Sequence, residues 1–95
     1  MIHIEQTDSG DPMVFRVRIE GPSGETSHRV SMSQDMYQGL CQGSISPTDC
    51  IDAAFRFLLD REPKETILES FDVRVINMYF SDFETILPDY FRKSS

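Results

Sequence analysis

The spacing of apolar residues changes near residue 33, and this change constrains the fold more than any other feature of the sequence. Before that point apolar residues recur at every second position, as in a strand with one buried face. Beyond it they recur at intervals of three and four, as in helices that bury one side. The chain has 95 residues and neither an internal repeat nor a long linker, so it fits one domain. We therefore predict a single α+β domain over 1–95. An antiparallel β-meander of two to three strands in 1–33 packs against three to four helices in 34–95.

The meander is predicted from two alternating segments, 13–20 and 26–33. Between them, Gly21-Pro22-Ser23-Gly24 is typical of a turn, because glycine tolerates positive φ and proline fixes its own φ. Ile2 and Ile4 predict a further strand before the polar loop 7–12. A lone hairpin is marginal in water, so this meander needs helices on its apolar face.

The strongest helix signal is Ser46-Pro47-Thr48-Asp49, which places an N-cap serine before a proline at the first helical position. Apolar residues of the helix predicted over 47–61 cover about 240° of its circumference, whereas a surface helix needs about 100°. We therefore expect this helix to lie at the centre of the core. A shorter helix over 34–42 precedes it, with Ser33 as its N-cap and Gly43 as its stop.

The C-terminal third predicts shorter elements. Pro63 ends the central helix and opens a short helix to Ser70. Asp72 can cap a last helix, whose apolar stripe includes Val75, Ile76, Tyr79, Phe80, Phe83, Ile86, Leu87 and Tyr90. Pro88 ends or kinks that helix. Ser81 and Glu84 also have the spacing of a capping box, which leaves two shorter helices as an alternative.

The sequence points to a reducing cytoplasm. Residues 1–8 lack the basic and apolar regions of a secretory signal, and no stretch approaches the roughly 20 apolar residues of a membrane helix. Cys41 and Cys50 are the only cysteines, fewer than a small secreted domain usually carries. We expect two reduced thiols that face the core, with a disulfide between them as the alternative.

Signals of catalysis are scarce. The sequence has no nucleophile elbow, zinc-protease motif, phosphate loop or dinucleotide-binding glycine run. His28 falls on the apolar side of its strand and His3 on the polar side, so both are expected to be structural. Asp49 and Asp52 share a helical turn, but they more simply complement the helix N-terminus. We therefore predict a protein that is not an enzyme and that has no metal and no cofactor.

The charge balance, nine Lys and Arg against sixteen Asp and Glu, gives a net charge of −7. This argues against non-specific nucleic-acid binding, which needs basic groups to neutralise phosphates. It leaves room for a local basic patch, because the alternation places Arg16, Arg18 and Arg29 on one face of the meander. That face is either a solvated surface with mixed charge pairs or a patch that docks an anion or a partner.

Aromatic residues concentrate near the C-terminus, where six of the ten lie from Phe71 onward. Most of them are expected to pack inward. Tyr90 and Phe91 follow Pro88, so we predict that they stay exposed and bind a partner or a second copy of the chain.

The segment 28–62 resembles the ribbon-helix-helix DNA-binding family in its order of strand, short helix, loop and longer helix. His28-Arg-Val-Ser-Met-Ser matches the ribbon strand. The resemblance implies a dimer whose paired strands read the major groove. The outward side chains would be Arg29, Ser31 and Ser33. The chain departs from the family in its acidic charge and in the strand at 13–20, which can pair with the ribbon strand within one chain.

Taken with the scarcity of catalytic motifs, these features predict a small acidic protein that acts as a non-enzymatic protein–protein interaction module, with a homodimer as one form. Its expected partner-binding residues are Arg16, Arg18, Arg29, Tyr90 and Phe91. The alternatives are a ribbon-helix-helix-like DNA-binding regulator and a small-ligand-binding domain with a pocket between sheet and helices.

Overall fold

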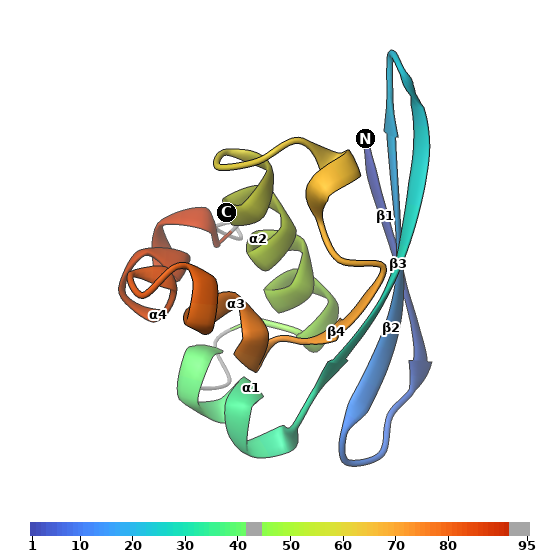
Figure 1. Cartoon of the computed structure of the whole chain (residues 1–95). Helices are drawn as coiled ribbons and strands as arrows, with labels where there is room; N and C mark the ends of the chain where they lie inside the picture. Colours follow the sequence, from blue (N-terminus) through green and yellow to red (C-terminus); the bar gives the residue numbers. More distant parts are fainter. Residues whose placement is uncertain (42–44, 92–95) are drawn as a thin grey trace.

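A computed structural model describes residues 1–41 and 45–91. It contains a mixed sheet of four strands in the order β1-β2-β3-β4, with helices packed on one face. In Figure 1 the sheet is seen nearly edge-on at the right, and the helices lie to its left. The predicted α+β class, with an N-terminal antiparallel meander and helices in the C-terminal part, is confirmed.

The meander consists of β1 (Ile2–Asp8), β2 (Met13–Gly21) and β3 (Gly24–Met32). The alternation predicted the faces correctly, since Phe15, Val17 and Val30 are buried toward the helices. The turn between β2 and β3 contains Gly24 with φ of 122°, a conformation that side chains with a Cβ rarely adopt.

The fourth strand, β4 (Ser70–Asp72), was not predicted. It pairs with β3 in parallel, with Arg29 opposite Ser70 and Ser31 opposite Asp72. The sequence signal pointed instead to a helix ending at Ser70. Three residues are too few to establish a period, and a pairing so distant in the chain leaves no local trace. Because β4 occupies the outer side of β3, the ribbon strand of the DNA-binding resemblance lies inside the sheet. It cannot pair there with a second copy.

The central helix α2 (Pro47–Leu59) lies between the sheet and the C-terminal helices, as Figure 1 shows. Its N-cap is Ser46, whose Oγ accepts a hydrogen bond from the Asp49 N–H at 3.2 Å. Seven of its residues are buried, and together they span several sides of the helix. Those residues are Cys50, Ile51, Ala53, Ala54, Phe55, Phe57 and Leu58. The predicted position at the centre of the core is therefore confirmed.

The remaining helices are short. Helix α1 (Gln34–Cys41) follows Ser33, whose Oγ accepts from the Met36 N–H, while the predicted helix end at Gln42 and the stop at Gly43 lie outside the described residues. A single turn, η1 (Lys64–Thr66), follows α2. The predicted last helix is divided into α3 (Arg74–Tyr79), α4 (Phe83–Ile86) and η2 (Leu87–Tyr90), which is the alternative with shorter helices.

Candidate functional site

The uncovered face of the sheet gathers the three arginines that the alternation placed together. Arg16 and Arg29 are Cα partners on β2 and β3, and Arg18 lies two residues further along β2. Arg18 forms an ion pair with Glu25, with 3.6 Å between Nη1 and Oε1. Within residues 1–41 and 45–91, no carboxylate forms an ion pair with Arg16 or Arg29. The shared face is therefore observed, whereas partner binding by these arginines stays a prediction.

Tyr90 and Phe91 are half-buried, so the prediction that they stay exposed is wrong. The Tyr90 ring packs edge-on against Phe57, with 5.9 Å between ring centroids, and its hydroxyl donates to Asp60 Oδ2 at 2.6 Å. Phe91 packs against the buried core. The turn η2, which contains Pro88 and Tyr90, packs against α2, and Phe91 directly follows it. Their predicted role in partner binding is untested.

The exposed aromatic residue is Tyr79, which the helical stripe had placed inward. Tyr79 is 70% exposed, and Met78 beside it is 82% exposed. The reason is the end of α3 at Tyr79, where Phe80 takes extended backbone angles of φ −130° and ψ 93°. The stripe therefore does not continue around one helix, and its members face different directions.

An apolar groove lies between α2, the segment after η1, β4 and α3. Its cavity volume is about 390 Å³. Its floor contains the buried side chains Leu58, Ile67 and Ile76, and its rim contains the exposed Leu68 and Tyr79. Phe71 of β4 lines it as well. We predicted a pocket between sheet and helices only as an alternative, and not its lining residues, because the groove depends on β4 and on the break after α3.

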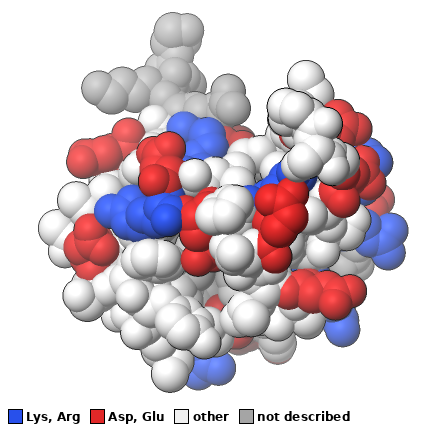
Figure 2. Space-filling view, turned by 45° about the horizontal axis from the view of Figure 1, so that its top comes forward, with Lys and Arg blue, Asp and Glu red and all other residues white. Residues whose placement is uncertain are grey.

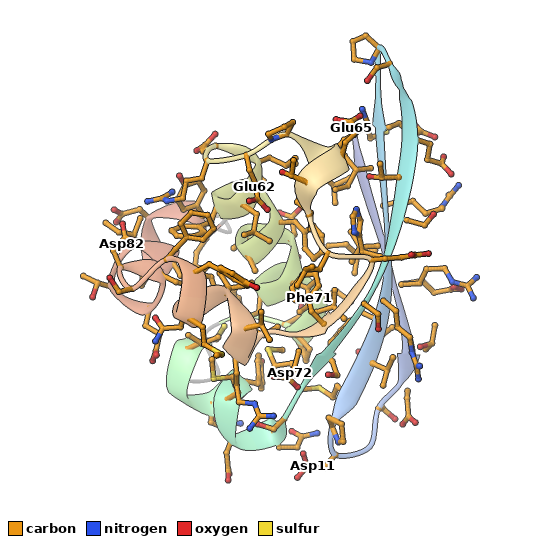
Figure 3. The ribbon with its side chains drawn as sticks, viewed as in Figure 1. Asp11, Glu62, Glu65, Phe71, Asp72 and Asp82 are labelled. Atoms are coloured by element: carbon orange, nitrogen blue, oxygen red, sulfur yellow. The ribbon has the colours of Figure 1, made fainter. Side chains whose placement is uncertain are left out.

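One carboxylate lies in this apolar setting. Glu62 lines the groove and is half-buried. Figure 3 shows Glu62 and Phe71 in the space between α2 and the segment that runs from η1 to β4. In the described part of the chain, no side chain pairs with the Glu62 carboxylate. Its carboxylate oxygens are in contact with solvent, so a cation brought by a ligand can reach them and pair with them at the edge of the apolar surface.

His28 holds the rim of the groove in place from inside the protein. Its Nδ1 lies 2.7 Å from the Leu68 carbonyl oxygen, and its Nε2 lies 3.0 Å from the Thr26 hydroxyl. Its ring is also in contact with Phe55, with centroids 5.6 Å apart. Both ring nitrogens therefore have structural partners, as expected for a histidine that faces the core.

Asp72 fixes the other side of the groove by joining β4 to β3 and α3. Its Oδ2 accepts from the Ser31 hydroxyl at 2.8 Å, and its Oδ1 accepts from the Arg74 N–H at 3.0 Å. Burial alone would raise the pKa of Asp72, but these hydrogen bonds outweigh it, so the pKa lies below its ordinary value.

Asp72→Asn is expected to make stability less dependent on pH in acid. The lowered pKa means that the folded chain favours the carboxylate. The stabilisation is therefore present above the unfolded-chain pKa of about 3.9 and is lost as pH falls through the lower folded pKa. Urea unfolding of both proteins from neutral pH to about pH 2.5 measures this. The difference in unfolding free energy between the wild type and Asp72→Asn should narrow as pH falls. A constant difference would contradict the lowered pKa of Asp72.

The two cysteines of the described segments have structural surroundings. Cys41 and Cys50 are buried and reduced, and their thiols hydrogen bond to each other. That bond and burial raise the pKa of Cys50, so its thiol stays neutral. In the described part of the chain, no three His, Cys, Asp or Glu residues cluster closely enough to bind a metal ion. None of the described helices has both the length and the apolar character to span a bilayer.

Comparison with known proteins adds no relative. No protein-family model matches the chain, and no curated protein or solved structure shows detectable similarity to it. Inferences about function therefore come from the surfaces described above.

Proposed function

We propose that this protein is a non-enzymatic, cytoplasmic interaction module that binds a basic amphipathic segment of a protein partner in the groove between α2 and α3. The single observation that carries the proposal is the Glu62 carboxylate, unpaired within the described residues, in a mainly apolar groove with an exposed apolar rim. Apolar side chains of the segment would cover Leu68 and Tyr79, and a Lys or Arg would pair with Glu62.

The charge of the whole chain supports a basic partner. The net charge is −7, and acidic side chains predominate on the face in Figure 2, where the basic ones lie apart from one another. Such a surface attracts cationic segments and repels acidic ones, which speeds encounter and adds specificity. It also disfavours DNA as a ligand.

Random peptides displayed on phage and selected on the immobilised protein test the proposal. The enriched peptides should combine apolar residues with Lys or Arg, and Tyr79→Ala should weaken their binding about tenfold, as expected for an interface aromatic. Fluorescence anisotropy measures the dissociation constants. Glu62→Gln should weaken binding and flatten its dependence on salt.

Two controls define the surface. Met78→Ala changes the neighbouring exposed residue of α3, which does not line the groove, so binding should not change. The double variant Arg16→Glu and Arg29→Glu alters the opposite side of the sheet and makes the chain more acidic, so it should not weaken binding. If no peptide is enriched, or if Met78→Ala weakens binding as much as Tyr79→Ala, the groove is not the docking site.

A small apolar cation is the second candidate ligand, because a cavity of about 390 Å³ falls within the range of small-molecule sites. The exposed rim favours the peptide, since Leu68 and Tyr79 would stay in water around a small ligand. In a thermal-shift screen of small organic cations, a ligand that protects the protein and displaces the selected peptides would favour the small-molecule function.

A further inference from the structure

The outer side of β1 carries backbone groups that pair with no other strand among residues 1–41 and 45–91. In that part of the chain β1 is the first strand of the sheet and has β2 as its single neighbour. Met1 and Glu20 exchange two backbone hydrogen bonds. In an antiparallel ladder such hydrogen-bonded pairs alternate with non-hydrogen-bonded pairs, so they recur at every second residue. His3 and Glu5 therefore direct their backbone groups toward β2. The N–H and C=O groups of Ile2, Ile4 and Gln6 therefore point outward.

The segment 2–6 lacks several of the features by which proteins prevent strand pairing. Edges are commonly protected by lysine, proline, a bulge or short length. The segment 2–6 has neither lysine nor proline, and the bulge of β1 comes after Gln6. The opposite edge, β4, is only three residues long. Ile2 and Ile4 are half-exposed beside the helices, so a further strand would also bury apolar surface.

We infer that β1 pairs antiparallel with β1 of a second copy of this chain, in the register that places Ile4 opposite Ile4. In this register Ile2 faces the second copy's Gln6, so all the outward backbone groups of this segment meet in hydrogen-bonded pairs. The result is a continuous sheet through both copies. The inference concerns the sheet edge and is independent of the groove.

The side chains that lie opposite one another favour this register over its neighbours. With Ile4 at the centre, each His3 lies opposite Glu5 of the other copy on the uncovered face. Moving the centre to His3 places the two His3 side chains together, and moving it to Glu5 places two carboxylates together. Two carboxylates directly opposite are destabilising, whereas an imidazole opposite a carboxylate adds a favourable contact to the one that His3 Nε2 makes with Glu20 Oε2 of its own chain at 3.3 Å.

The register predicts a specific cross-link. His3 and the second copy's Glu5 form a non-hydrogen-bonded pair, with Cα atoms about 4.5 Å apart, which a disulfide can span. A mixture of His3→Cys and Glu5→Cys proteins should therefore form a mixed disulfide dimer with oxidised glutathione as the oxidant. Either protein alone should cross-link far less, because its cysteines lie on a diagonal of about 7–8 Å. Mass spectrometry of non-reduced samples measures each dimer.

A backbone variant tests the edge directly. Ile4→Pro removes an N–H that points away from β2, so the fold should survive while the dimer dissociation constant rises about tenfold or more. Ile4→Val keeps the N–H and should retain the dimer. Sedimentation velocity over a concentration series gives the masses, and circular dichroism checks the fold. If Ile4→Pro does not fold, the cross-link still decides.

A wild-type protein that stays monomeric at high micromolar concentration would overturn the inference. Equal cross-linking by His3→Cys alone would overturn the register, and an Ile4→Pro protein that folds and still dimerises would show another interface. A monomer that still binds selected peptides through Tyr79 would refute the dimer and leave the groove function standing.

Discussion

Phe55→Ala should lower the free energy of unfolding by about 3–5 kcal/mol, a large part of the stability of a domain this small. The Phe55 side chain is fully buried. Its ring contacts His28 at 5.6 Å and Phe71 at 5.9 Å between centroids, so it joins α2 to β3 and β4. Alanine would leave a cavity at this junction. The melting temperature should fall by more than about 10 °C in thermal denaturation.

Met78→Ala is the matched control, because Met78 is 82% exposed and its loss should change stability by less than about 0.5 kcal/mol. If Phe55→Ala melted within a couple of degrees of the wild type, the position of α2 at the centre of the core would be wrong.

Phe57→Ala should cost about as much, roughly 3–5 kcal/mol, but on the other side of α2. The Phe57 ring packs against Phe83, Phe80 and Tyr90, with centroid distances of 5.1, 5.8 and 5.9 Å. The Arg61 guanidinium also lies 3.7 Å from the ring centroid, a favourable cation–π geometry. Denaturant unfolding measures the total loss.

Amide hydrogen exchange distinguishes the two phenylalanine variants. Phe57→Ala should increase exchange mainly in α3, α4 and η2, whereas Phe55→Ala should increase it mainly in β3 and β4. Phe57→Leu, which keeps much of the apolar volume, should be destabilised less than Phe57→Ala. Identical exchange patterns would contradict the placement of α2 between two separate packing layers.

The sequence predicted the elements whose signals are local. The alternation in β2 and β3 identified both faces of the hairpin, including the shared face of Arg16 and Arg29. Ser46 marked the start of α2, and the wide apolar surface of that helix identified the centre of the core. In these segments the apolar pattern and the capping and turn residues agree with the final structure, so these elements can be predicted from one sequence.

The candidate site was missed because its signals are not local. β4 is defined by its parallel partner and by the Ser31–Asp72 hydrogen bond, which joins residues 41 positions apart. The exposure of Tyr79 depends on the break at Phe80, which the helical stripe does not reveal. Tyr90 is held by Asp60, a contact that requires the chain to turn back on itself. The spacing of apolar residues shows which side of a helix or strand is buried, but it does not show which distant segment packs against it.

The late position of β4 in the chain has a consequence for synthesis. The edge of β3 that β4 covers stays open until Ser70–Asp72 have left the ribosome, so the nascent meander carries a template for wrong pairing. The groove wall that includes Phe71 also forms only at this stage. A truncated product ending before β4 would therefore be prone to aggregate and would lack one wall of the groove, so the strand that seals the sheet also completes the proposed docking surface.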